Sequence, residues 1–484
     1  MVHPHIFFLQ LNEINFDYVD EYIRLGYLPT FKVLFEEYGY VETTSETEHH
    51  LANPWIQWPT VHTGMSYAEH KVFRLGDIVK HDHEMIYEAL EKQGISVAAL
   101  SAFNARNNTK NSKFFVPDPW TKTPFTGSHS LRRIYNALCQ VANDYAKEKI
   151  SLQSYCDLLL GAIGNANYKS IPNYIKETLS YIEGKTWFRA VICDRLLLDT
   201  FVTQCKKHKP EFATVFLNGG AHLQHHYLFS SKAYCGERTN PDWHVPENED
   251  PLLDMLKLYD EALKNTLTLA NNVENGRVIV ATALHQNAHE RETYYYRIDD
   301  HVDFLQKIGI EYTDTYNLMT EDFVLCFESE QLALEAEQNI LNVETVDTEE
   351  IFYVETADKA VRTLNKNAKI FHTENRGKDI YVQLKPVAAL IPVETKIKSN
   401  GVIIDNFGKL VSLAQVKNTH HHGVGYYVDT GFSKGELPDS FPLKDLFGMF
   451  LESYGIQSDR QAKMDPDFLA AIRRHANGDA KIAA

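Results

Sequence analysis

Short runs of β-branched and aromatic residues restrict the fold of this chain more than any other feature of its sequence. Five such runs are typical of buried strands: His5–Leu11, Ser96–Phe103, Phe212–Leu217, Arg277–Leu284 and Gly425–Asp429. Stretches with apolar residues at helical spacing alternate with them: Phe16–Leu25, Asp82–Gln93, Asp254–Asn272 and Leu443–Tyr454. This alternation predicts an α/β fold, in which a mainly parallel sheet is sandwiched by helices. In such sheets, ligands bind beyond the carboxyl ends of the strands.

The length of 484 residues exceeds what one hydrophobic core usually organises, so we expect a large core domain with insertions. The core is assigned to residues 1–130, 210–293 and 403–484. Residues 131–209 are rich in helix formers and are predicted to form a helical insertion, a lid. Residues 294–402 are predicted to form a small α+β insertion. Both insertions are expected to roof the pocket and set the size of the substrate.

Within the second insertion, six segments have the pattern of regular elements. The predicted strands are VLCFES, IFYVET, IFHTE and DIYVQL, and the predicted helices are LALEAEQNIL and ADKAVRTLN.

The charge balance excludes one broad class of function. Lys and Arg number 48 against 65 Asp and Glu, a net charge of −17, and such a chain repels the phosphate backbone of nucleic acids. The first residues lack the basic and apolar regions of a secretory signal, and no apolar run approaches the roughly 18 residues of a membrane span. We therefore expect a soluble, cytoplasmic protein that binds no nucleic acid duplex.

Polar residues gather where the predicted strands end. They are Asn12 and Glu13, then Asn218 and His222 with His225 and His226 close behind, then His285 and His289, and finally His420, His421 and His422. Carboxylate, amide and imidazole groups are common ligands of divalent cations. Each cluster alone is equally well explained as a solvated turn. Together they favour a shared metal site, because buried imidazoles and carboxylates are unfavourable unless they are paired or metal-bound.

In their order along the chain, these clusters resemble the motifs of the alkaline phosphatase superfamily, particularly its type I phosphodiesterases and nucleotide pyrophosphatases. The resemblance spans the chain from Ile6 to about Ile456 without the two insertions. The motifs that carry it are the TG pair at Thr63 and Gly64, the DxxxH motif as Asn218-x-x-x-His222, the SDHG motif as Ala283-Leu284-His285-Gln286, and the HxxxG motif as His421-x-x-x-Gly425.

The resemblance implies a hydrolase or transferase that uses one or two divalent ions, zinc or manganese, to activate a hydroxyl nucleophile. Carried over residue by residue, it implies one ion held by Asn218, His222 and His421. A second ion would be held by Glu13 and His285.

The sequence departs from this pattern at the nucleophile. Counting back from the TG pair leads to Pro54, and no Ser or Thr occurs in residues 48–59. Asn218 and Leu284 stand where the pattern has ligand carboxylates, which predicts weaker metal binding. The active site is therefore expected to be degenerate.

Two sources could supply the missing nucleophile in such a site. Thr60 would act as a displaced nucleophile with His62 nearby, or a metal-bound water would attack directly.

Three functions remain open at this point. The first is a metal-dependent hydrolase or transferase for a phosphoester or a related anionic ester, with a small anionic substrate. The second is a catalytically silent protein of the same fold that binds an anionic ligand or a partner. The third is a histidine-rich metal store, which the concentration of histidines at strand ends disfavours. The sequence predicts no oligomeric state.

Overall fold

The computed structural model describes residues 3–46, 48, 51–143, 165, 167–317, 322–346, 351–355, 362–365 and 367–476. The chain forms two compact units. Unit 1 comprises Met1–Ala288 and Thr419–Ala484, and unit 2 comprises His289–Asn418. Two strands, β7 (His285–Ile298) and β17 (Val411–His422), carry the chain from unit 1 to unit 2 and back, and they pair with each other.

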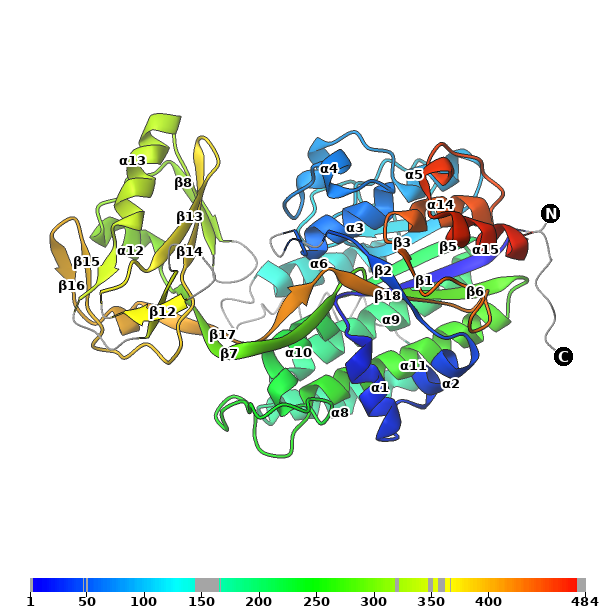
Figure 1. Cartoon of the computed structure of the whole chain (residues 1–484), viewed down its shortest axis with the longest axis horizontal. Helices are drawn as coiled ribbons and strands as arrows, with labels where there is room; N and C mark the ends of the chain where they lie inside the picture. Colours follow the sequence, from blue (N-terminus) through cyan, green and yellow to red (C-terminus); the bar gives the residue numbers. More distant parts are fainter. Residues whose placement is uncertain are drawn as a thin grey trace. The chain divides into compact units, whose positions relative to one another are not determined.

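Unit 1 is built on an eight-stranded sheet in the spatial order β19-β2-β18-β6-β1-β5-β3-β4 (Figure 1). Its strands are β1 (His5–Leu11), β2 (Val41–Thr44), β3 (Val97–Ala102), β4 (Phe114–Pro117), β5 (Phe212–Leu217), β6 (Gly276–Ala281), β18 (Val424–Asp429) and β19 (Ser440–Pro442). The central strand β1 is parallel to both neighbours, β5 and β6, whereas β18 is antiparallel to β6. The carboxyl ends of β1, β5 and β6 therefore meet at one edge of the sheet.

Alternate residues of β1 enter two separate hydrophobic layers. Phe7, Leu9 and Leu11 pack with α1 (Phe16–Arg24), α2 (Pro29–Glu37), α9 (Phe188–His208) and α11 (Pro251–Asn271). Ile6 and Phe8 pack with α3 (Pro54–Thr63), α5 (Ile86–Lys92), α14 (Asp445–Ser453) and α15 (Pro466–Ala476). This follows from the period of two in a strand, which turns successive side chains to opposite faces. Helices consequently cover both faces of the sheet, as Figure 1 shows.

The helices of unit 1 have the following bounds: α1 (Phe16–Arg24), α2 (Pro29–Glu37), α3 (Pro54–Thr63), α4 (Tyr67–His70), α5 (Ile86–Lys92), α6 (His129–Asn143), α8 (Ile171–Ile182), α9 (Phe188–His208), α10 (Gly219–Tyr227), α11 (Pro251–Asn271), α14 (Asp445–Ser453) and α15 (Pro466–Ala476). Among the described residues, no helix is both long and apolar enough to cross a membrane.

The predicted fold class is confirmed. All five predicted strands belong to the central sheet, and two of them, His5–Leu11 and Phe212–Leu217, have the predicted bounds. Helix α5 begins later than expected, at Ile86, and the preceding Asp82 pairs with Arg106 instead of capping the helix.

Unit 2 has its own hydrophobic core. Its helices are α12 (His301–Lys307) and α13 (Glu330–Leu341). Its strands, besides the adjoining parts of β7 and β17, are β8 (Asp314–Asn317), β9 (Phe323–Cys326), β10 (Glu344–Thr345), β11 (Phe352–Glu355), β12 (Arg362–Asn365), β13 (Phe371–Asn375), β14 (Asp379–Leu384), β15 (Ile397–Ser399) and β16 (Val402–Ile404). The α+β character agrees with the sequence prediction, but the end of the ADKAVRTLN segment is strand β12, not helix, because it pairs with β11.

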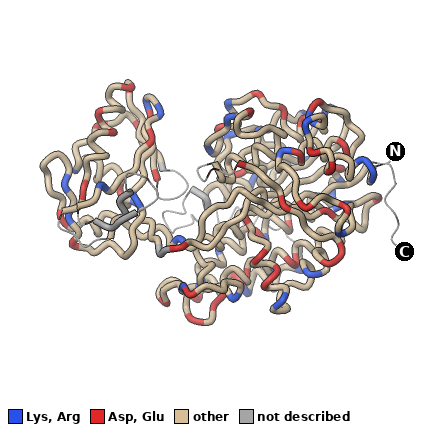
Figure 2. The backbone as a smooth tube through the Cα atoms, in the orientation of Figure 1, with Lys and Arg blue, Asp and Glu red and all other residues tan. Residues whose placement is uncertain are grey.

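The predicted helical insertion, residues 131–209, contains a helix that belongs to the main layers of unit 1. Val191, Phe201 and Cys205 of α9 are buried in the same cluster as β1 and β5. Residues 144–164 of the predicted lid lie outside the described residues. Over the whole described chain, Lys and Arg are interspersed with Asp and Glu, the usual pattern for a globular surface (Figure 2).

Candidate metal site at the carboxyl ends of the central strands

Polar side chains converge at the edge of the sheet where β1, β5 and β6 end. Glu13 follows β1 and has a left-handed backbone with φ 60°, which is uncommon for a residue other than glycine. Its backbone N–H donates to the carbonyl of Thr282, just beyond β6, at 3.2 Å. Asn218 follows β5 and stands at the start of α10. The chain turns thus bring side chains from three distant segments to one place.

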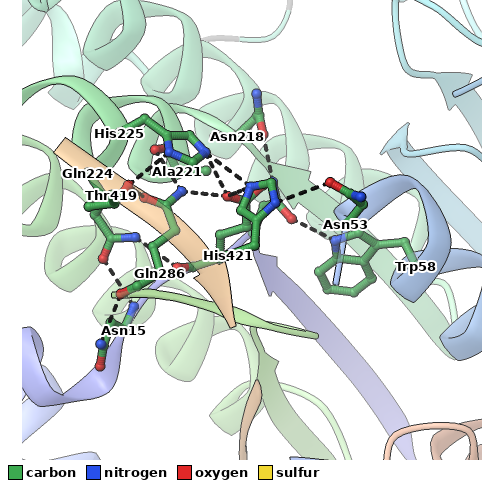
Figure 3. Close-up of polar contacts among 12 residues, drawn as sticks. Asn15, Asn53, Trp58, Asn218, Ala221, Gln224, His225, Gln286, Thr419 and His421 are labelled. Atoms are coloured by element: carbon green, nitrogen blue, oxygen red, sulfur yellow. Dashed lines mark hydrogen bonds and ion pairs between the residues drawn. The ribbon is translucent and has the colours of Figure 1, made fainter. Parts of the chain in front are cut away.

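Three ligand atoms form a triangle at this edge (Figure 3). Glu13 Oε2 lies 3.0 Å from His421 Nε2 and 3.1 Å from His225 Nε2. The two Nε2 atoms are 3.2 Å apart. Glu13 comes from the end of β1, His225 from α10 and His421 from β17, and all three lie in unit 1. Among the described residues, this is the group that could hold a metal ion.

The carboxylate of Glu13 is buried, with 3% of the residue exposed, and is held by amides. Asn12 Nδ2 donates to Glu13 Oε1 at 2.9 Å, and Gln286 Nε2 donates to Oε2. The indole N–H of Trp58 donates to Asn12 Oδ1 at 2.8 Å, which fixes the orientation of the Asn12 amide. The carboxylate is therefore oriented before any ligand arrives.

The protonation state of Glu13 is set by opposing effects. Burial by itself raises the pKa of this carboxyl group. The charges of His421 and His225 and their hydrogen bonds outweigh burial and hold the pKa well below its usual range. Glu13 is consequently an anion at neutral pH.

Both histidines are held through the ring nitrogen that faces away from Glu13. His225 Nδ1 lies 2.8 Å from Thr419 Oγ1, and His421 Nδ1 lies 3.2 Å from Asn53 Oδ1. A hydrogen bond at Nδ1 orients the ring and directs Nε2 toward a ligand.

The donor set fits a divalent transition metal. One carboxylate and two imidazoles, with a fourth position left open, are a known ligand set of catalytic zinc. In a tetrahedral site with metal–nitrogen distances of about 2.0 Å, ligand atoms lie about 3.3 Å from one another. The measured separations of 3.0, 3.1 and 3.2 Å agree with this geometry.

The ligand grouping differs from the one that the sequence implied. Glu13 and His421 were assigned to different ions but lie together in the structure. Asn218 is close by and accepts a hydrogen bond from Asn12 Nδ2 at 2.8 Å, outside the triangle. His222 lies on α10 with its ring 4.4 Å from that of His226. It is His225, three residues further along α10, whose ring nitrogen reaches Glu13.

The sequence contained His225 but gave no signal that selects it. Residues three apart on a helix differ by about 60° in direction, so the choice between His222 and His225 depends on how α10 is rotated against the sheet. Thr419 and Gln286 were not predicted as site residues, because a threonine or glutamine within a strand is usually only part of the strand.

His285 lies apart from the triangle. Its Nδ1 donates to the carbonyl of Val424 at 2.7 Å, and its ring stacks between Tyr426 and His422, with centroid distances of 5.2 and 4.7 Å. Burial, together with the neighbouring His422, lowers the pKa of His285 to about 4, so this ring is neutral. The predicted ligand pair of Glu13 and His285 is not formed.

Thr60 and His62 do not form the predicted catalytic pair. Both side chains are buried in α3, and residues two apart on a helix point about 200° away from each other. Thr60 Oγ1 lies 3.2 Å from His70 Nε2. The ring of His62 packs between Trp58 and Tyr87, and burial lowers its pKa to about 3.

The start of α3 lies beside the metal-ligand triangle. Pro54 is the first residue of α3, and Asn53, immediately before it, contacts His421. Pro54 is the position at which the resemblance places the hydroxyl nucleophile. A proline there offers no hydroxyl group.

Unit 1 thus has an α/β sheet with a candidate metal site at its strand ends, and comparison with solved structures finds similar folds. The chain is similar to phosphonoacetate hydrolase from Sinorhizobium meliloti 1021 (11% identity, 93% of this chain and 96% of that chain, TM-score 0.40). It is also similar to human ectonucleotide pyrophosphatase/phosphodiesterase 5 (10%, 94% and 96%, TM-score 0.40) and to the alkaline phosphatase PafA (12%, 94% and 97%, TM-score 0.43).

With such low identities and TM-scores, the likeness assigns no residue role and no activity to this chain. No protein-family profile matches the sequence, and no curated protein matches it.

Proposed function

We propose that this protein is a metal-dependent hydrolase or transferase that acts on a phosphoester or a related anionic ester. The observation that carries the proposal is the triangle of Glu13, His225 and His421, whose three ligand atoms lie 3.0 to 3.2 Å apart. The order of motifs along the sequence, which resembles that of the alkaline phosphatase superfamily, supports the ester as substrate class.

The charges of the ligands support an anionic substrate. When bound, a divalent cation such as zinc or manganese supplies positive charge that polarises an ester and lowers the pKa of nearby water. Glu13 offsets one of the two positive charges, and neutral imidazoles offset none. One unit of positive charge is therefore left to attract and bind a small anion.

The protein residues have separate tasks in this proposal. Glu13 and the two imidazoles bind the cation, while Asn12 and Gln286 keep the buried carboxylate oriented. Because Pro54 has no hydroxyl group, the nucleophile comes from water or from a second substrate and no enzyme ester forms at the start of α3.

The same proline favours a second candidate function. A catalytically silent protein would keep the metal site and bind an anionic ligand or a partner without turning it over. The two functions differ in turnover and agree in metal binding.

The test combines metal content with turnover. Elemental analysis of the purified chain should find about one zinc or manganese per chain, and a generic aryl phosphodiester should be hydrolysed. Glu13→Gln and His421→Ala should lose both metal and turnover. His372→Ala is the matched control, because His372 is exposed in unit 2.

Each outcome separates the candidates. Metal with turnover supports the hydrolase, and metal without turnover of phosphodiesters, phosphomonoesters or sulfate esters supports the silent protein. A chain that takes up no zinc or manganese even when it is added would reject both.

A further inference from the structure

Gln286 has only one amide orientation that satisfies its neighbours. Its Nε2 faces Glu13 Oε2 and the backbone carbonyl of Ala221, the latter at 3.1 Å. Both neighbours can only accept hydrogen bonds. The amide nitrogen must therefore lie on this side, and Oε1 must face Thr419.

This orientation fixes the direction of the next two hydrogen bonds. Thr419 Oγ1 lies 2.6 Å from Gln286 Oε1 and must donate its proton to it, because an amide oxygen only accepts. The hydroxyl oxygen of Thr419 then accepts from His225 at 2.8 Å. His225 consequently carries a proton on Nδ1.

We propose that Gln286 and Thr419 are positioning residues that commit His225 to bind a cation through Nε2. Neither residue touches the ion. A neutral His225 with Nδ1 protonated has its lone pair on Nε2, and this atom lies 3.1 Å from Glu13 Oε2 and 3.2 Å from the Nε2 of His421. Three electron-rich atoms this close together repel one another unless positive charge, from a ring proton or from a bound cation, lies among them. This inference rests on the proposed function, since the cation concerned is its metal ion.

The hydrogen bond that orients the ring is more fully buried at His225 than at His421. The exposed fractions of Gln286 and Thr419 are both 0%, so water cannot replace their hydrogen bonds. Asn53, which holds His421, is only half-buried. Loss of the Thr419 hydroxyl should therefore weaken metal binding more than loss of the Asn53 amide.

The affinity arm of the test removes one hydroxyl while preserving the shape of the side chain. Thr419→Val should weaken zinc binding about 10- to 100-fold in competition with a chromogenic chelator. Thr419→Ser restores the hydroxyl and should bind within about threefold of the original chain. Thr266→Val is the matched control: Thr266 is equally buried and bonds to the carbonyl of Ala262 at 2.9 Å in α11.

The second arm reads the tautomer directly in the metal-free chain. In protein labelled with ¹⁵N at histidine, the His225 signal, identified by its loss in His225→Gln, should show a proton on Nδ1 at pH 8. In Thr419→Val this preference should disappear.

Two results would overturn the inference: equal zinc affinities for Thr419→Val and Thr266→Val, or a neutral His225 protonated on Nε2 in the original chain. Absence of zinc binding to the original chain would reject the proposed function instead, and the tautomer arm would still decide the positions of the protons.

Discussion

Units 1 and 2 differ in the kind of polar group that they bury. Among the described residues of unit 2, the buried polar side chains are all uncharged: Thr293, Thr345, Thr395, Ser399 and Asn418. Unit 1 buries ionisable side chains, including Glu13, Asp194 and Arg277. Because an unpaired buried charge is strongly unfavourable, each ionisable group in unit 1 needs a partner.

Two buried carboxylates of unit 1 have partners of different kinds. Asp429 forms a bidentate ion pair with Arg277, so its charge is neutralised within the fold. Glu13 instead faces two histidines, which carry no permanent charge, at 3.0 and 3.1 Å. The first pair is closed and structural, whereas the second places three ligand atoms at the spacing of a metal site. Burial of a charge therefore indicates function only when its partner is not a permanent charge.

The largest expected effect tests the closed pair. Asp429→Ala leaves the guanidinium of Arg277 buried without its partner and should destabilise unit 1 by about 3–5 kcal/mol. All five tryptophans of the chain lie in unit 1, so urea unfolding followed by tryptophan fluorescence reports this unit alone. Asp439→Ala, at an exposed position, is the control and should change stability by less than about 0.5 kcal/mol. Equal effects of the two substitutions would contradict the distinction.

The next effect tests the open site. Zinc at about 100 times its dissociation constant should stabilise unit 1 by about 2.7 kcal/mol in the same fluorescence assay. Glu13→Gln should abolish this gain, and excess chelator should reverse it in the original chain. A gain of similar size in Glu13→Gln would place the binding elsewhere.

A somewhat smaller effect concerns pH. Burial lowers the pKa of His62 to about 3, below the usual value of 6.5 for an unfolded chain. Between these two values, the unfolded state binds a proton at His62 and the folded state does not. The stability that the neutral His62 contributes is therefore present above pH 6.5 and is lost as the pH falls toward 3. Between pH 7 and 5, the loss due to this residue amounts to about 2 kcal/mol.

His62→Leu removes this titrating group, so the unfolding free energy of the variant should fall by about 2 kcal/mol less over the same range. The measurement is urea unfolding by tryptophan fluorescence at pH 7, 6 and 5. Parallel pH profiles for the original chain and the variant would show that groups other than His62 cause the pH dependence of stability.

The smallest effect belongs to unit 2. Lys396 and Asp405 form an exposed ion pair at 3.4 Å. Exposed pairs contribute about 0.2–1 kcal/mol, and Lys396→Ala should change the stability of unit 2 by no more than that, as measured by far-ultraviolet circular dichroism. A larger loss would mean that unit 2 also depends on charge pairing, and the contrast between the units would fail.

The strands of the sheet were predictable because their apolar runs are determined locally. The runs at β1 and β5 are buried on both faces, so most of their residues are apolar and the pattern can be recognised without knowing the neighbouring strands. The segment that ends in β12 was misassigned for the opposite reason. Its sequence favours a helix, and only the pairing with β11, which lies elsewhere in the chain, makes it a strand.

The location of the site could be predicted from the sequence, but not the full set of residues that form it. The rule that ligands gather at strand ends identified Glu13 and His421. The choice of His225 over His222 depends on the rotation of α10, and the contribution of Gln286 depends on a hydrogen bond to Thr419 across more than a hundred residues. Neither is encoded in local spacing. The separation of Thr60 from His62 was predictable, because residues two apart on a helix point to nearly opposite sides.

The continuity of unit 2 along the chain has a practical consequence. The chain leaves unit 1 after Ala288 and returns at Thr419 on strands that are paired with each other, so everything between can be exchanged without altering the strand order of the sheet. The two splice points are, however, next to the residues that position His225: Gln286 stands two positions before one, and Thr419 is the first residue after the other. A chimera that carries a foreign module will therefore keep an intact His225 only if its junctions preserve the backbone register of these two residues.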